Sequence, residues 1–169
     1  MSEAIVNRVA NSALVTFNLE EYYHAGDRVV YDIRQNLFQD LILKEKDFRA
    51  FVKEHDWQQY DGKNVALICT TDAVIPTWAY MLLTTAIAPY ANLVVFGDLE
   101  ALEQALFQQA LTNIDLQQFS DQRVVIKGCS KVDVPVFAYV EIIRLLQPIT
   151  KSLMYGEPCS TVPIYKAQK

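Results

Sequence analysis

Three cysteines in similar surroundings are the residues of this chain best suited to chemistry. Cys69 and Cys129 are each followed by a hydroxyl residue, Thr70 or Ser130, and then by a short stretch that ends at a proline. Cys159 stands in the same context. A buried free cysteine usually behaves as a small hydrophobic residue, and such packing does not require a shared context. The recurrence therefore favours a functional role for the thiols.

Metal binding is the first chemistry that these thiols suggest. Three thiolates that converge could hold a soft metal ion or three corners of an iron–sulfur cluster. Catalytic zinc is likewise held by three protein ligands and one open position. The sequence predicts metal binding by Cys69, Cys129 and Cys159, with an iron–sulfur cluster, zinc or iron as the cofactor. The fourth ligand would be an exogenous group or one of five donors: Asp72, Glu157, Asp133, His24 and His55.

Two other interpretations of the cysteines stay open. The chain could be an enzyme that uses one activated cysteine, because a helix N-terminus favours the thiolate over the thiol. It could also be a structural or interaction module with three inert, buried thiols. Other enzyme signatures are missing, since the five glycines form neither a dinucleotide-binding loop nor a phosphate-binding loop.

Hydroxyl and aromatic residues near the cysteines complete the candidate site. The hydroxyls could donate hydrogen bonds to sulfur or to an anion, although helix or turn capping is the simpler role. The aromatic rings could wall a pocket beside the cysteines, although they could equally belong to the core. These candidate cofactor-binding residues are Thr70, Ser130, Ser160, Trp78, Tyr80 and Tyr139.

An internal repeat surrounds the first two cysteines. Residues 65–97 and 124–156 share prolines and strand-end glycines at an offset of 59, as in Pro76 and Pro135 (135 − 76 = 59). The two cysteines differ by 60, so one residue is missing between Cys129 and Pro135. We therefore predict that the chain contains a duplicated strand–loop–helix–strand unit.

The pattern of apolar runs predicts an α/β fold. Strands expected at 64–68, 93–97, 123–128 and 152–156 alternate with helices expected at 76–88, 98–111 and 135–147. Such alternation is typical of a parallel or mostly parallel sheet with flanking helices, in a Rossmann-like three-layer arrangement. The carboxyl ends of parallel strands share one edge, where α/β folds bind their ligands, so the three sulfurs should meet there.

The chain length fits one domain, 1–169, in which an N-terminal α+β portion precedes the duplicated core. The N-terminal portion covers residues 1–63, with strands expected at 14–19 and 29–33 and a helix at 46–54. The duplicated α/β core covers residues 64–169.

Composition limits the partners. The net charge is −5 and no basic run occurs, which excludes nucleic acid as an expected partner and disfavours anionic membranes. Residues 73–97 carry no charge, but prolines interrupt them, so we expect a buried helix and strand rather than a membrane span. The apolar helix at 76–90 predicts a homodimer. No signal peptide is recognisable, so reduced thiols in the cytoplasm are expected.

Four long strings of the chain are distinctive. They lie at 5–10, 41–49, 69–80 and 155–163: Ile-Val-Asn-Arg-Val-Ala, Leu-Ile-Leu-Lys-Glu-Lys-Asp-Phe-Arg, Cys-Thr-Thr-Asp-Ala-Val-Ile-Pro-Thr-Trp-Ala-Tyr and Tyr-Gly-Glu-Pro-Cys-Ser-Thr-Val-Pro. These strings resemble a bacterial family catalogued as domain of unknown function 2480. In that family, genes often lie beside those for sulfur-mobilisation (Suf) iron–sulfur cluster assembly. The resemblance therefore implies an accessory role in cluster assembly, with assembly proteins as partners, but no catalytic residue.

Overall fold

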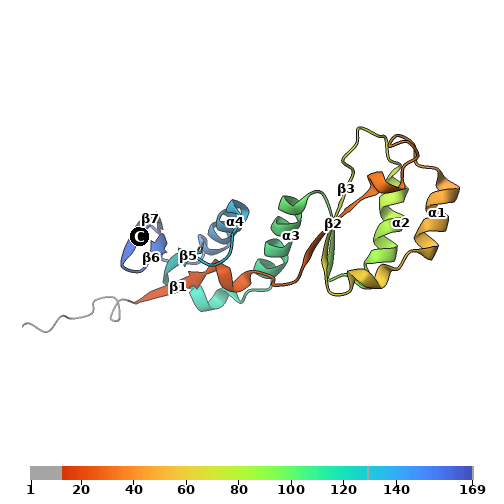
Figure 1. The fold of residues 1–169 in the computed structure, drawn as a ribbon. Helices are drawn as coiled ribbons and strands as arrows, with labels where there is room; N and C mark the ends of the chain where they lie inside the picture. Colours follow the sequence, from red (N-terminus) through yellow and green to blue (C-terminus); the bar gives the residue numbers. More distant parts are fainter. Residues whose placement is uncertain (1–12, 129, 169) are drawn as a thin grey trace, which may run out of the picture. The chain divides into compact units, whose positions relative to one another are not determined.

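A computed structural model describes residues 13–128 and 130–168, and these form two compact units (Figure 1). One unit comprises residues 24–106 and contains a three-stranded sheet. The other comprises the described residues up to Tyr23 and those from Phe107 onward, and it contains a four-stranded sheet. We call them the three-stranded unit and the four-stranded unit.

The three-stranded unit has a fully parallel sheet in the order β2-β3-β4. The central strand, β3, is buried along most of its length, as expected for a parallel strand covered on both faces. The bounds of its elements are β2 Arg28–Asp32, η2 Ile33–Asn36, α1 Glu45–Glu54, η3 Trp57–Tyr60, β3 Asn64–Ile68, α2 Thr77–Ile87 and β4 Leu93–Phe96.

Each face of this sheet has its own hydrophobic cluster. On one face, Val65 and Leu67 of β3 pack with Leu83 of α2 and with aromatic residues such as Tyr31. On the other face, Ala66 packs with Leu102 and Leu106 of helix α3 (Leu99–Thr112). The unit therefore has helices on both sides of the sheet.

The four-stranded unit has the strand order β1-β5-β6-β7. Its first three strands are parallel, and β7 returns antiparallel to β6 with an irregularity at Leu153 and Met154. The last turns of α3, from Phe107, also belong to this unit. The bounds of its other elements are β1 Leu14–Asn18, η1 Leu19–Tyr22, η4 Leu116–Phe119, β5 Arg123–Lys127, α4 Val136–Leu146, β6 Ser152–Glu157 and β7 Ser160–Lys166.

Alternate side chains of the four-stranded sheet form the core of that unit. Phe17, Val124 and Leu153 come from three strands and are almost fully buried. They pack against helix residues, including Phe107 of α3 and Ile142 of α4. The core of this unit therefore occupies the sheet face that α4 covers.

The predicted α/β class, with mostly parallel sheets, is confirmed, but the strands form two sheets rather than the single sheet that the alternation suggested. The predicted N-terminal extension is also not separate, because β1 pairs with β5 and β2 pairs with β3. Hydrophobic periodicity identifies a strand but not its partner. The assignment of residues 1–169 to one domain stays a prediction.

None of the helices in the described part of the chain is both long and apolar enough to cross a membrane. In the uncharged stretch 73–97, a helix of 11 residues is followed by a strand of four, as expected. The helix buries one side, but the residues of the strand are half-buried or exposed rather than buried.

Glycine substitutions test the backbone at the end of β6. Gly156 has φ 120°, and an added Cβ would lie 2.6 Å from the carbonyl oxygen of Ser160. Gly62 has φ 66°, and an added Cβ would meet open space. We expect Gly156→Ala to lower the free energy of unfolding by more than ~2 kcal/mol, against about 1 kcal/mol for Gly62→Ala. Urea denaturation measures both values, and equal losses would contradict the described backbone at Gly156.

Candidate functional site

Cys69 lies directly after the carboxyl end of β3, the central strand of the three-stranded unit. Its side chain is half-buried, and its thiol is free. The thiol can donate a weak hydrogen bond to the carbonyl oxygen of Thr71, with 3.5 Å between sulfur and oxygen. Cys69 therefore lies, as the sequence predicted, at the carboxyl end of a parallel strand.

A carboxylate from the neighbouring strand holds the loop that follows Cys69. Asp32 ends β2 and caps η2 by accepting a hydrogen bond from the backbone N–H of Arg34. It also accepts hydrogen bonds from the backbone N–H of Thr70, at 3.2 Å, and from the Thr70 hydroxyl. Desolvation raises the pKa of Asp32, but these hydrogen bonds outweigh it, and the net pKa lies below its usual value. Thr70 therefore acts as an anchor for the loop.

Arg34 and Tyr80 complete the charged surroundings of Cys69. The pKa of Arg34 is raised, first by its hydrogen bond to Asp40 at 2.9 Å, and further by the charges of Asp32 and Cys69. Desolvation raises the pKa of Tyr80, and the charges of Cys69 and Asp32 add to this shift. Arg34 and Tyr80 thus each lie within electrostatic range of both the Cys69 sulfur and the Asp32 carboxylate. We call Cys69, Asp32, Arg34, Thr70 and Tyr80 the Cys69 site.

In the four-stranded unit, a different carboxylate holds the loop that follows β5. Glu20, in η1 after β1, accepts hydrogen bonds from the backbone N–H groups of Ser130 and Lys131, the second at 2.7 Å. The Ser130 hydroxyl donates to the other carboxylate oxygen at 2.9 Å. The hydrogen bond from Lys131 is the main cause that lowers the pKa of Glu20 to about 2. The hydroxyl residue after the second cysteine is thus bound like Thr70.

Aromatic pairs lie near both loops. Tyr80 meets Phe96 of β4 edge-to-face, with 5.1 Å between ring centroids, and Tyr139 meets Tyr155 of β6 in the same way at 5.8 Å. An added Cβ at Gly128 would lie 2.6 Å from the Tyr139 hydroxyl oxygen, so Tyr139 reaches the end of β5. Both tyrosines, which were candidates for a pocket wall, therefore project from helices α2 and α4 toward strand residues.

The three cysteines are not shown to meet. Cys69 belongs to the three-stranded unit, whereas Cys159 is exposed in the turn between β6 and β7 of the other unit. Cys129 lies outside the described residues. Within the described ranges 13–128 and 130–168, no three His, Cys, Asp or Glu side chains form a group that could hold a metal ion. The expectation of one shared sheet edge fails because the strands belong to two sheets.

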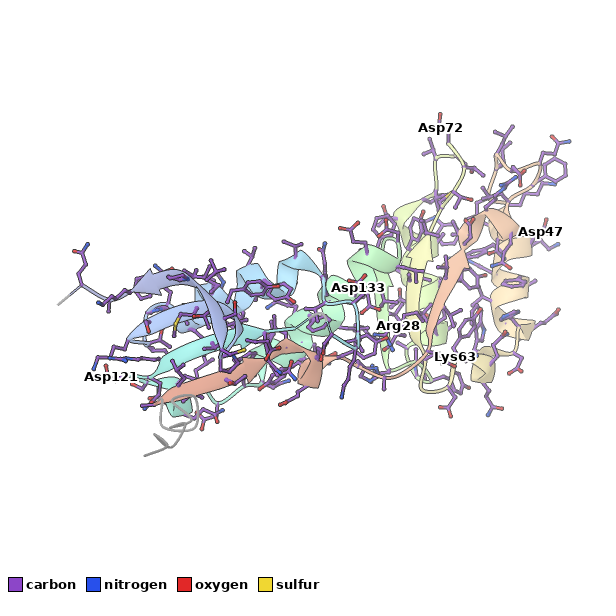
Figure 2. The ribbon with its side chains drawn as sticks, turned by 60° about the vertical axis from the view of Figure 1, so that its left-hand side comes forward. Arg28, Asp47, Lys63, Asp72, Asp121 and Asp133 are labelled. Atoms are coloured by element: carbon purple, nitrogen blue, oxygen red, sulfur yellow. The ribbon has the colours of Figure 1, made fainter. Side chains whose placement is uncertain are left out.

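The other candidate ligands have ordinary surroundings. Asp72 is exposed in the loop between β3 and α2, as Figure 2 shows, and Asp133 is also exposed. Glu157 pairs with Lys127 at 3.5 Å. His24 lies beside Asn64, at the end of β3 opposite to Cys69.

Three further candidates have the following surroundings. His55 contacts the ring of Trp57, with 4.5 Å between centroids. Trp78 packs against Phe48, with 6.0 Å between ring centroids. Ser160 is exposed at the start of β7.

Sequence analysis missed Asp32, Arg34 and Glu20. A signal for Asp32 was present, because the strands at 14–18 and 28–32 each end in an Asx residue that caps a short helix. This shared pattern could have marked both strands as parts of the core and Asp32 as a residue at the site.

Protonation of Glu20 should release the loop that follows β5. Because the native pKa is lowered from 4.5 to about 2, the contribution of this carboxylate is complete above pH 4.5 and is lost as the pH falls toward 2. Because the native carboxyl titrates at its own pKa, we expect the backbone amide NMR signals of Ser130 and Lys131 to shift with a midpoint near pH 2. In Glu20→Gln these amide signals should differ from wild type at neutral pH, whereas the control Glu21→Gln should leave them unchanged. A Glu20 carboxyl that titrates at its ordinary value would contradict this result.

Comparison with known proteins identifies the family without adding an activity. No curated protein and no solved structure matches the chain. A family profile described as "Protein of unknown function (DUF2480)" matches residues 3–167, nearly the whole sequence. The chain therefore belongs to this family of unknown function.

Proposed function

We propose that Cys69 is a reactive thiol and that the Cys69 site performs thiol-dependent chemistry. The observation that carries this proposal is the position of the half-buried thiol at the end of a central parallel strand, within electrostatic range of Arg34. A thiolate is the nucleophilic form of cysteine, and a neighbouring guanidinium attracts it. Asp32 and Thr70 keep the loop in place, so that the sulfur has a defined position.

Tyr80 gives the site a second polar group. Its pKa is raised, chiefly by desolvation, so the phenol is protonated at neutral pH and can donate a hydrogen bond. Such a donor beside a nucleophilic sulfur can stabilise negative charge that develops on a bound substrate. The proposed reaction class is therefore attack of the Cys69 sulfur on an electrophilic carbon or sulfur atom.

Alkylation rates test this proposal. Iodoacetamide forms a sulfur–carbon bond and releases iodide, and peptide mass spectrometry follows each cysteine separately. We expect Cys69 to react faster than Cys159, although Cys159 is more exposed. Arg34→Gln should slow the reaction of Cys69 roughly 1.5- to 5-fold, because an exposed ion pair is worth about 0.2–1 kcal/mol.

Arg49→Gln provides the matched control, since Arg49 is a similarly exposed arginine that pairs with Glu45 in α1. This change should leave the rate at Cys69 unaltered. The proposal would be overturned if Cys69 reacted more slowly than Cys159 and if Arg34→Gln had no effect.

Metal or iron–sulfur binding through Cys69, Cys129 and Cys159, as an accessory to cluster assembly, is the second proposal. Cys69 and Cys159 are free thiols, and each follows the end of a strand. Each is therefore available as a soft metal ligand, which supports this proposal. The two proposals differ in their dependence on Cys129 and Cys159, which the Cys69 site does not use.

Elemental analysis of anaerobically purified protein tests the second proposal. We expect iron with acid-labile sulfide, or zinc, at a fixed ratio to the chain, and a loss of metal in Cys129→Ser and Cys159→Ser. Ser120→Ala, at an exposed turn after η4, serves as the control variant and should keep the full metal content. A metal-free anaerobic preparation would contradict metal binding but would leave the alkylation result intact.

We also propose that residues 65–97 and 124–156 are two copies of one strand–loop–helix–strand unit. Pro76 and Pro135 directly precede α2 and α4, which supports this proposal. Gly97 and Gly156 follow with φ 132° and 120°. Helices on both faces of the three-stranded sheet support a Rossmann-like layering. Self-association through α2 is a further proposal, supported by the exposed side chain of Met81.

A further inference from the structure

The four-stranded unit has a groove at the end of the sheet opposite to the loop that follows β5. It has a volume of about 640 Å³, within the usual range of ~300–1,000 Å³ for small-molecule sites. It lies at the end of the sheet where β1, β5 and β6 begin and where β7 ends. The residues that line it include Arg123, Lys151, Ser152, Met154, Pro163 and Lys166.

Strand register places four of these residues in one row across the sheet. Leu14 pairs with Arg123, Arg123 pairs with Ser152, and Ser152 pairs with Lys166. Residues in register on neighbouring strands share a face and lie ~4.8 Å apart between strands. Ser152 is therefore flanked in this row by Arg123 on one neighbouring strand and by Lys166 on the other.

On β6 and β7, the next row of residues on this face is apolar. Met154, two residues after Ser152, pairs with Pro163 of β7. Because side chains alternate along a strand, this row follows the first on the same side of the sheet. The opposite face carries Val124 and Leu153 of the core. The groove thus combines a polar, cationic end with an apolar floor.

The charge of the groove is opposite to that of the chain. Arg123, Lys151 and Lys166 line it, and no carboxylate is among the described residues that do. None of the ion pairs found between described residues involves these three cations. The whole chain has a net charge of −5, so three cations without ion pairs in one groove are a local concentration of positive charge.

We propose that this groove binds a small anion with an apolar body, such as a carboxylate or a phosphate monoester attached to an alkyl chain. The anionic group lies at Ser152, where the hydroxyl donates a hydrogen bond and Arg123 and Lys166 supply charge. The alkyl chain lies along Met154 and Pro163. The site is independent of Cys69, which belongs to the other unit.

NMR titration of the full chain tests the proposal with defined probes. We expect octanoate or octyl phosphate to shift the amide signals of Ser152 and its neighbours in the row, with a dissociation constant below ~5 mM. Acetate and inorganic phosphate lack the apolar body, and octanol lacks the charge, so each should bind at least ~10-fold more weakly. Arg123→Gln/Lys166→Gln should weaken binding of the alkyl anion by ~10-fold or more, as expected when charged hydrogen bonds are lost.

Lys46→Gln/Lys53→Gln is the matched control. It removes two exposed cations of α1 in the other unit, changes the net charge equally, and should leave the dissociation constant unchanged. If both double variants bound the alkyl anion equally weakly, the loss of affinity would follow from net charge alone, and the proposal would be overturned. It would also be overturned if octanol bound as tightly as octanoate, if the short anions bound as tightly as their alkyl derivatives, or if no probe shifted these signals.

Discussion

Hydrogen bonds from backbone N–H groups to two carboxylates hold the loops on which the candidate chemistry depends. Asp32 binds the loop that follows β3, and Glu20 binds the loop that follows β5. In each unit the carboxylate comes from the segment at the end of the first strand, and the loop leaves the neighbouring central strand. Without these contacts the loop N–H groups would have only water as a partner, and the residues beside the cysteines would lose their fixed positions.

This arrangement explains why parallel pairing matters for the site. Parallel strands bring Asp32 of β2 level with Ile68 of β3, one residue before Cys69. The carboxylate can then reach Thr70, while Arg34 and Tyr80 come within electrostatic range of the sulfur. An antiparallel partner would place the start of β2 at this edge instead of its end. The geometry at Cys69 is therefore a consequence of the sheet, with the loop anchored by hydrogen bonds.

The four-stranded sheet uses its two faces differently. Phe17, Val124 and Leu153 form the core with α4, whereas the row of Leu14, Arg123, Ser152 and Lys166 lies on the opposite face. In the three-stranded unit, Leu102 and Leu106 of α3 pack on the second face. A groove with positive charge and a thiol site are thus carried by different units, and each can be altered without substitution in the other.

The sequence by itself determined the local elements of this protein. Apolar runs and prolines predicted β3 at its observed bounds, and they placed α2 and α4 within one residue of their observed ends. The position of Cys69 after β3 followed from the same pattern. These features could be predicted because strand and helix periodicity and the effect of proline on a helix start are local properties.

Only the tertiary structure decided which strands pair and which side chains meet. Asp32 and Thr70 are 38 residues apart, and Glu20 and Ser130 are 110 residues apart, so no local pattern joins them. The division of the strands into two sheets, which assigns Cys69 and Cys159 to different units, was equally invisible in the periodicity. Pairing depends on the packing of whole faces and on hydrogen bonds between distant segments, and these interactions exist only once the chain has folded.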